Sequence, residues 1–280
     1  MNDEREKSGE ESAKKELIAA VFARAASNYE RIKYFWPMGR LLVEKAAIPP
    51  GADVLDVACG RGAALFPAAE QVGPTGQVIG VDLSAPMAEQ TDAEIQRRGL
   101  SNASARQMDA ERLEFPEASF DYVLCGFALA FFPRLERALE EFSRVLKPGG
   151  RLAASTWGDE DPHWHWYGDM CAAYGIGVKM LTQSLDTPDE LRVALQRSGF
   201  TDIQVSTVPF DMIYADEEEW WMTKWSISGR ATLEQMEPAV LARFKAEAFE
   251  HMQAIKQPDG FHEQLQAHFA IAAKSAPIGP

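Results

Sequence analysis

Short apolar segments alternate with helix-length segments between residues 53 and 156, and this alternation restricts the fold more than any other feature of the sequence. Apolar segments of five or six residues are typical of buried strands. Such strands are predicted over 53–57, 77–81, 103–108, 120–125 and 151–156, with helices over 63–72, 84–98 and 135–146. Strands that alternate with helices form a parallel sheet covered on both faces. The sequence therefore predicts a doubly wound α/β fold.

Two later segments, 203–208 and 268–274, are predicted as further strands. They bring the expected sheet to seven strands, mostly parallel. Two helices, over 15–26 and 39–47, are predicted before the first strand. Proline and glycine at 49–51 end the second of them.

The remaining segments define the expected domain organisation. Residues 1–14 are polar with charges of both signs, a composition that predicts a disordered leader. Residues 15–280 are expected to form one domain. Two insertions, about 158–185 and 216–257, are expected to form helical lids over the open edge of the sheet.

Charge and cysteine content restrict the partners and the compartment. The formal net charge is −14, and no Lys/Arg-rich face offsets it, so nucleic acid is excluded as a partner. No apolar stretch reaches the roughly 18 residues that span a membrane. Cys59, Cys125 and Cys171 are far apart and have no zinc-ligand spacing, so we expect no disulfide frame and no metal site. We therefore expect a cytoplasmic protein without membrane insertion, and the sequence leaves its oligomeric state open.

Small and acidic residues follow the predicted strands at the points where each strand ends. Ligands of doubly wound sheets bind in the crevice beyond these carboxyl ends. Asp82 ends the second strand, 22 residues after Gly60, close to the spacing of an acid that accepts ribose hydroxyls. The other strand-end candidates are Asp56, Ala58, Cys59, Gly60 and Gly62 after the first strand, Asp109 and Ala110 after the third, and Cys125, Gly126 and Phe127 after the fourth.

A nicotinamide-dependent oxidoreductase is the rival interpretation of this pattern. Its fingerprint, G-x-G-x-x-G, reads Ala58, Gly60 and Ala63 here and fails at both ends. A dinucleotide also leaves Asp109 without a role. We therefore favour a different adenosine-containing cofactor.

The segments VLDVACGRG, GVDLS, QMDAERLEFP, FDYVLC and RVLKPGG together resemble the ordered motifs of class I S-adenosylmethionine-dependent methyltransferases. They are most similar to the ubiquinone/menaquinone-biosynthesis type. The resemblance covers residues 21–156. It includes the segment VFARAASNYER, which is similar to the family's N-terminal segment and whose aromatic residue is here Tyr29. It implies a Rossmann-like fold, S-adenosyl-L-methionine as cofactor and S-adenosyl-L-homocysteine as product.

The resemblance also implies a role for each strand end. The turn from Ala58 to Gly62 lies under the methionine part of the cofactor, and Asp56 orients this turn or meets the cofactor's amino group. Asp82 binds the ribose. The adenine is expected to contact Leu83, Met87, Asp109 and Ala110, and the methionine end to contact Cys125, Gly126 and Phe127. Ala58 departs from the family's commoner glycine.

All seven tryptophans lie outside residues 37–156. Tryptophan offers a large apolar surface with one polar group, which suits an aromatic-lined lid over an apolar acceptor. The same rings could instead pack the lid onto the body. The substrate-contacting candidates are Trp36, Phe127, Phe131, Trp157, Trp220, Trp221 and Trp225.

His163 and His165 follow the fifth strand and are the candidate catalytic residues, since a histidine beside the acceptor can take its proton. Bonding to a neighbouring loop group is the alternative. The function expected from these observations is methyl transfer by in-line displacement to a small, largely apolar or aromatic metabolite. A cofactor-binding scaffold with a regulatory role, or a non-methyl reaction on the same fold, is the alternative function.

Overall fold

The protein folds around one mixed sheet of seven strands, in the order β3-β2-β1-β4-β5-β7-β6. The computed structural model describes residues 2–29, 32–159, 161–176, 185–226 and 229–275. All pairings are parallel except those of β7, which runs antiparallel to β5 and β6. The strands are β1 (Asp53–Val57), β2 (Gln77–Asp82), β3 (Ala103–Gln107), β4 (Phe120–Gly126), β5 (Leu146–Trp157), β6 (Phe200–Tyr214) and β7 (Phe261–Lys274). The predicted fold class is confirmed.

Helices cover both faces of this sheet, because successive strand residues point to opposite faces and both faces are apolar. In β4, Val123 packs against α5 and α7, whereas Leu124 packs against α2, α3 and α4. The helices of the body are α2 (Phe35–Ala46), α3 (Leu65–Val72), α4 (Ala85–Arg98), α5 (Leu135–Val145) and α7 (Pro188–Arg197). Gly99, with φ +66°, ends α4 where a left-handed residue was expected.

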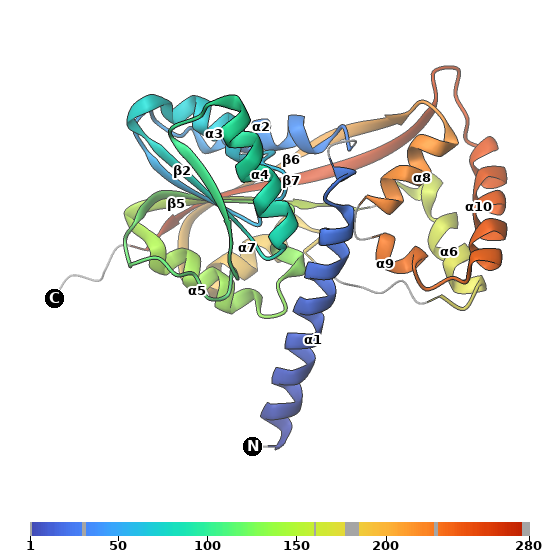
Figure 1. Ribbon diagram of the computed structural model, residues 1–280, viewed down its shortest axis with the longest axis horizontal. Helices are drawn as coiled ribbons and strands as arrows, with labels where there is room; N and C mark the ends of the chain where they lie inside the picture. The colour runs from blue at the N-terminus through green and yellow to red at the C-terminus, as the bar shows by residue number, and fades with distance from the viewer. Residues whose placement is uncertain (1, 30–31, 160, 177–184, 227–228, 276–280) are drawn as a thin grey trace.

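The last two strands are longer than predicted and leave the sheet as a two-stranded ribbon. β6 begins at Phe200 and ends at Tyr214, and its register with β7 continues to the pair Tyr214–Phe261. Figure 1 shows this ribbon running from the body to a separate group of helices, which we call the cap. The cap consists of α6 (Trp166–Ala173), α8 (Glu217–Trp225), α9 (Arg230–Leu233) and α10 (Pro238–Gln253). The predicted helical stretch over 216–257 is thus three helices.

The cap has its own apolar core, distinct from the two cores of the sheet. Trp164, Trp220, Phe244 and Phe261 are buried together in it. The second half of the predicted insertion over 158–185 falls largely on residues 177–184, outside the described residues. In the part of the chain that the structure describes, no helix combines the length and the apolar character needed to cross a membrane.

The N-terminal helix α1 (Asn2–Ala25) begins well before the helix predicted from residue 15. The sequence predicts a disordered leader there, and the structure has helix instead. Glu, Lys and Arg are good helix formers, and propagation from an anchored end adds one hydrogen bond per residue. The anchor is the other end of α1, where Ile18 and Val21 are buried with Ala231 of the cap and Arg24 pairs with Glu234 at 2.5 Å.

Candidate active site

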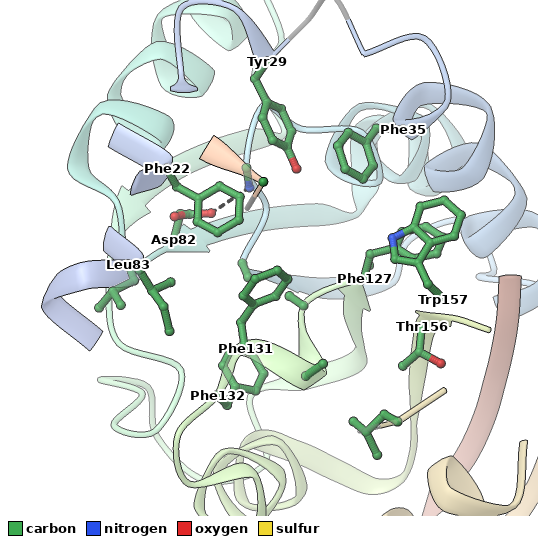
Figure 2. Close-up of a pocket in the computed structure, with 18 of the residues that line it drawn as sticks. Phe22, Tyr29, Phe35, Asp82, Leu83, Phe127, Phe131, Phe132, Thr156 and Trp157 are labelled. Carbon is green, nitrogen blue, oxygen red and sulfur yellow. Dashed lines mark hydrogen bonds between the residues drawn. The ribbon is translucent and has the colours of Figure 1, made fainter. Parts of the chain in front are cut away.

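A cavity of about 560 Å³ lies where the carboxyl ends of β1, β2, β4 and β5 meet the cap and α1. Figure 2 shows aromatic side chains surrounding it, with Asp82 at one side. Predicted site residues that line it are Tyr29, Ala58, Gly60, Asp82, Leu83, Met87, Asp109, Ala110, Gly126, Phe127, Phe131 and Trp157. The structure therefore brings together residues from six predicted segments, the N-terminal one and the ends of five strands.

The turn after β1 is held open by left-handed backbone and by hydrogen bonds. Ala58, Gly60 and Gly62 have φ values of +54°, +51° and +84°. For Ala58 this conformation costs about 1–2 kcal/mol, since a Cβ crowds the following carbonyl. The N–H of Cys59 donates to the carbonyl of Val81 (3.0 Å), and the N–H of Gly62 donates to the carbonyl of Cys59 (2.8 Å). The turn thus presents backbone to the cavity without a bulky side chain.

Asp82 joins the end of β2 to this turn. Its Oδ2 accepts from the N–H of Gly60 and its Oδ1 from the N–H of Ser84, both at 2.8 Å. Burial raises the pKa of Asp82 to about 6, while these two N–H groups act in the opposite direction. Each oxygen retains a lone pair for a ligand. The carboxylate is therefore oriented toward the cavity and can accept two hydroxyls.

Asp56 lies behind the turn rather than in the cavity wall. It is 1% exposed, and the N–H of Leu65 bonds its carboxylate. Burial, and then the charge of Asp82, raise the pKa of Asp56 to about 8. Of the two expected roles, this position favours orientation of the turn. Three other predicted residues likewise lie beneath the lining rather than in it: Cys59, Gly62 and Cys125.

Asp109 is tied to α1 by an ion pair that the sequence did not predict. Its Oδ2 accepts from Lys15 Nζ at 2.7 Å, and its Oδ1 accepts from the N–H of Glu111 at 2.9 Å. Lys15 also pairs with Glu111 at 2.6 Å. The contact spans 94 residues of sequence, so no local pattern could have shown it. α1 thus closes the cavity over the expected adenine position.

Stacked aromatic pairs form the rest of the wall. Phe127 and Trp157 stack with ring centroids 4.1 Å apart, and Tyr29 stacks on Phe35 at 4.9 Å. Figure 2 shows both pairs bordering the same space. Sequence reasoning missed Phe35, which lies before the helix predicted over 39–47 and is the first residue of α2. Other lining aromatics that it missed are Phe22, Tyr34, Phe132, Tyr167 and Tyr214.

Four predicted substrate tryptophans do not line the cavity. Trp36 stacks on Phe66 on the outer face of α3, 5.9 Å between centroids, and does not line the cavity. Trp220 and Trp221 are 0% and 5% exposed in the core of the cap, and Trp225 packs at its border. The sequence shows that these residues are lid residues but not which face of each helix turns inward. They serve packing, the alternative stated above.

The predicted catalytic histidines also lie outside the cavity lining. His163 is 76% exposed, and its Nδ1 lies 2.9 Å from Asp161 Oδ1, so it serves the local turn. His165 is exposed at the start of α6. Neither lines the cavity. No imidazole therefore stands at the site among the residues that the structure describes.

Carboxylates dominate the charged part of the lining. The described charged residues in it are Asp82, Asp109, Glu111, Asp159, Asp186 and Glu263, against Lys15 and Lys224. A cavity with this balance attracts cations. The arrangement can hold a molecule with vicinal hydroxyls and positive charge beside an aromatic, water-poor space.

The chain is similar to known proteins in sequence and in fold. The methyltransferase-domain family matches residues 54–150. The chain is 44% identical over 134 residues to the nocamycin O-methyltransferase of Saccharothrix syringae, covering 47% of this chain and 48% of that one. It is 28% identical to the demethylmenaquinone methyltransferase of Geobacillus kaustophilus, covering 71% and 94%. The solved structure of the YcgJ protein from Bacillus subtilis has a TM-score of 0.60 at 20% identity, covering 84% and 96%. The chain thus spans about half the length of the first of these relatives.

Proposed function

The chain belongs to the class I S-adenosylmethionine-dependent methyltransferases, and we propose that it transfers the methyl group of S-adenosylmethionine to a small, largely apolar or aromatic metabolite. The observation that carries this proposal is the continuity of the cavity. One space contains both the strand-end residues expected to bind the cofactor and the stacked aromatic pairs. Its volume, about 560 Å³, lies in the ordinary range for small-molecule sites.

The residues present fit the cofactor. Asp82 keeps one free lone pair on each oxygen for the ribose hydroxyls, and the N–H bonds from Gly60 and Ser84 fix its orientation. Leu83 and Met87 offer an apolar surface for the adenine. The excess of lining carboxylates suits a ligand that carries a sulfonium and an ammonium group. Ala58 and Gly60 expose backbone where the methionine part is expected.

The protein's task in such a reaction is positional. When bound, the cofactor supplies a methyl group that its sulfonium makes electrophilic. Phe127 and Trp157 border the expected methyl position and exclude water from it. Their planar surfaces also favour a flat acceptor, which they hold for in-line attack. With His163 and His165 outside the cavity, we expect no histidine base.

The choice of acceptor class rests on the cavity and on the relatives. The walls offer aromatic surface, and the relatives named above include an O-methyltransferase of nocamycin and a methyltransferase of demethylmenaquinone. The negative lining opposes a polyanionic acceptor, so nucleic acid stays excluded in our proposal. The methylated atom is left open.

Two measurements test the proposal. Calorimetry should show micromolar-range binding of S-adenosylhomocysteine, on the order of −8 kcal/mol, and no binding of NAD. Incubation with S-adenosylmethionine and a panel of two- and three-ring hydroxylated aromatics should release S-adenosylhomocysteine only when an acceptor is present. Binding of NAD in place of S-adenosylhomocysteine would overturn the family-based function. Cofactor binding without turnover on any aromatic acceptor would favour the scaffold alternative.

A further inference from the structure

The cavity continues past the stacked Phe127–Trp157 pair along one face of the β6–β7 ribbon. Trp157 lies opposite Ala267 in the β5–β7 register. Leu265 and Glu263 follow on the same side of β7, at alternate positions, and both line the cavity. Four residues of strand from Ala267 to Glu263 correspond to about 13 Å. The far end of the cavity is therefore a molecule's length from the expected methyl position.

Glu263 is an unusual residue to find at this end. It is 8% exposed and lies opposite Met212 in the ribbon register. Among the described residues, its carboxylate forms no ion pair with Lys, Arg or His. Its Oε2 accepts from the hydroxyl of Tyr214 at 2.5 Å. One hydrogen bond leaves most of the acceptor capacity of this carboxylate unused, and no oxygen of Glu263 is among the fully buried unpaired atoms, so the remaining lone pairs are open to a donor in the cavity.

Tyr214 fixes the direction of this carboxylate. It is 2% exposed, and its ring meets Trp164 of the cap edge-on with centroids 5.9 Å apart. Burial, and then the charge of Glu263, hold the pKa of Tyr214 well above its ordinary value. Tyr214 therefore stays a hydrogen-bond donor. The pair presents an oriented carboxylate, while the rest of the Glu263 side chain is held by packing.

We propose that Glu263, positioned by Tyr214, accepts a hydrogen bond from a hydroxyl at the end of the acceptor distant from the methylated atom. The acceptor class is then an elongated hydroxylated aromatic of two or three rings, whose body lies along Leu265 and against Trp157. The inference rests on the proposed function, because it takes the acceptor to be bound beside the cofactor.

The test uses two matched probes, 2-hydroxyanthraquinone and anthraquinone, titrated into the protein saturated with S-adenosylhomocysteine. Tryptophan fluorescence reports the affinity. We expect wild type to prefer the hydroxylated probe by about tenfold or more, as for a hydrogen bond to a charged acceptor. Glu263→Gln should reduce the preference to below about threefold, because the amide turns a donor toward the probe. Met212→Leu, a change in the same wall without an acceptor group, should keep the wild-type preference.

Tyr214→Phe is the second variant, because it retains the ring and removes only the hydroxyl that holds the carboxylate. Its preference should fall between those of wild type and Glu263→Gln, with the melting temperature of each variant measured alongside. Equal affinity of wild type for both probes, absence of binding, or an unchanged preference in both variants would overturn the inference. Calorimetry of S-adenosylhomocysteine binding distinguishes failure of the proposed function from failure of the role of Glu263. Wild type that fails to bind it contradicts the proposed function, whereas normal binding with equal probe affinities contradicts only the role of Glu263.

Discussion

The body and the cap hold the two halves of the cavity by different means. In the body, the backbone shapes the cavity. Left-handed residues form the turn after β1, and N–H groups orient Asp82. In the cap, side chains decide the surface, since Tyr167, Thr223 and Lys224 line the cavity while the adjacent Trp220 and Trp221 fill the core. In our proposal the cofactor is met largely by the backbone of the body, and the acceptor by side chains that can change singly.

The largest effect should come from Trp220→Ala. The side chain is 0% exposed and stacks on Trp164 at 5.7 Å. Its truncation should lower the unfolding free energy of the cap by about 3–5 kcal/mol. If body and cap are separate units, the affinity for S-adenosylhomocysteine should change less than about threefold. Segment-resolved hydrogen exchange and calorimetry measure the two effects. If cofactor binding were lost together with the protection of cap amides from hydrogen exchange, the body and the cap would not be independent units.

Asp82→Ala should act on the opposite half. Removing a charged acceptor leaves ribose hydroxyls unpaired and should weaken cofactor binding by about 2–4 kcal/mol. The melting temperature should fall as well, because the N–H groups of Gly60 and Ser84 lose their acceptor, so the affinity is measured at a temperature where both proteins are folded. Asp189→Ala, whose side chain is 90% exposed on α7, is the matched control. An affinity within twofold of wild type would remove Asp82 from the ribose site.

Asp56→Asn should change how stability depends on pH. The pKa of Asp56 rises from its ordinary 3.8 to about 8 in the fold. Between pH 4 and pH 8 the folded state therefore keeps the proton of this carboxyl, whereas the unfolded state has lost it. The contribution of Asp56 to the unfolding free energy therefore falls as pH rises through that window. Asparagine does not titrate, so the variant should gain about 3–4 kcal/mol relative to wild type between pH 5 and pH 8. Denaturant titrations at the two pH values measure this. Parallel pH profiles for the two proteins would show that Asp56 is charged in the fold.

Lys15→Met should have the smallest effect. It tests whether α1 covers the cofactor half of the cavity. The side chain is 16% exposed and pairs with Asp109 and Glu111. Its loss should cost about 1 kcal/mol of stability and speed the release of S-adenosylhomocysteine a few-fold, since α1 is held less firmly over the adenine position. Stopped-flow displacement measures the rate, with Lys14→Met as the control on the same helix. Equal release rates in the two variants would show that α1 does not cover the cofactor.

The sequence was most informative where function follows from local backbone. Positions such as Gly60 and Asp82 are tied to strand ends, and strand ends could be located from apolar segments alone. Trp220 and Thr223 show the limit: both lie on one short helix, and only the packing of that helix decides which faces the cavity. Lys15 and Glu263 show a second limit, because their neighbours are 94 and 49 residues away in sequence. No spacing rule connects such positions.

The ribbon that carries the cap has a consequence for how enzymes of this shape diversify. Tyr214 and Phe261 face each other as the last register pair, so the segment between them leaves and re-enters the fold at adjacent points. A segment with neighbouring ends can be exchanged for another of different length without altering the strands that precede it. Residues 215–260 are therefore a natural cassette. Grafting the corresponding segment of a relative onto this ribbon should change the cap residues that line the cavity, such as Thr223 and Lys224, while Glu263, Trp157 and the cofactor half remain those of the host.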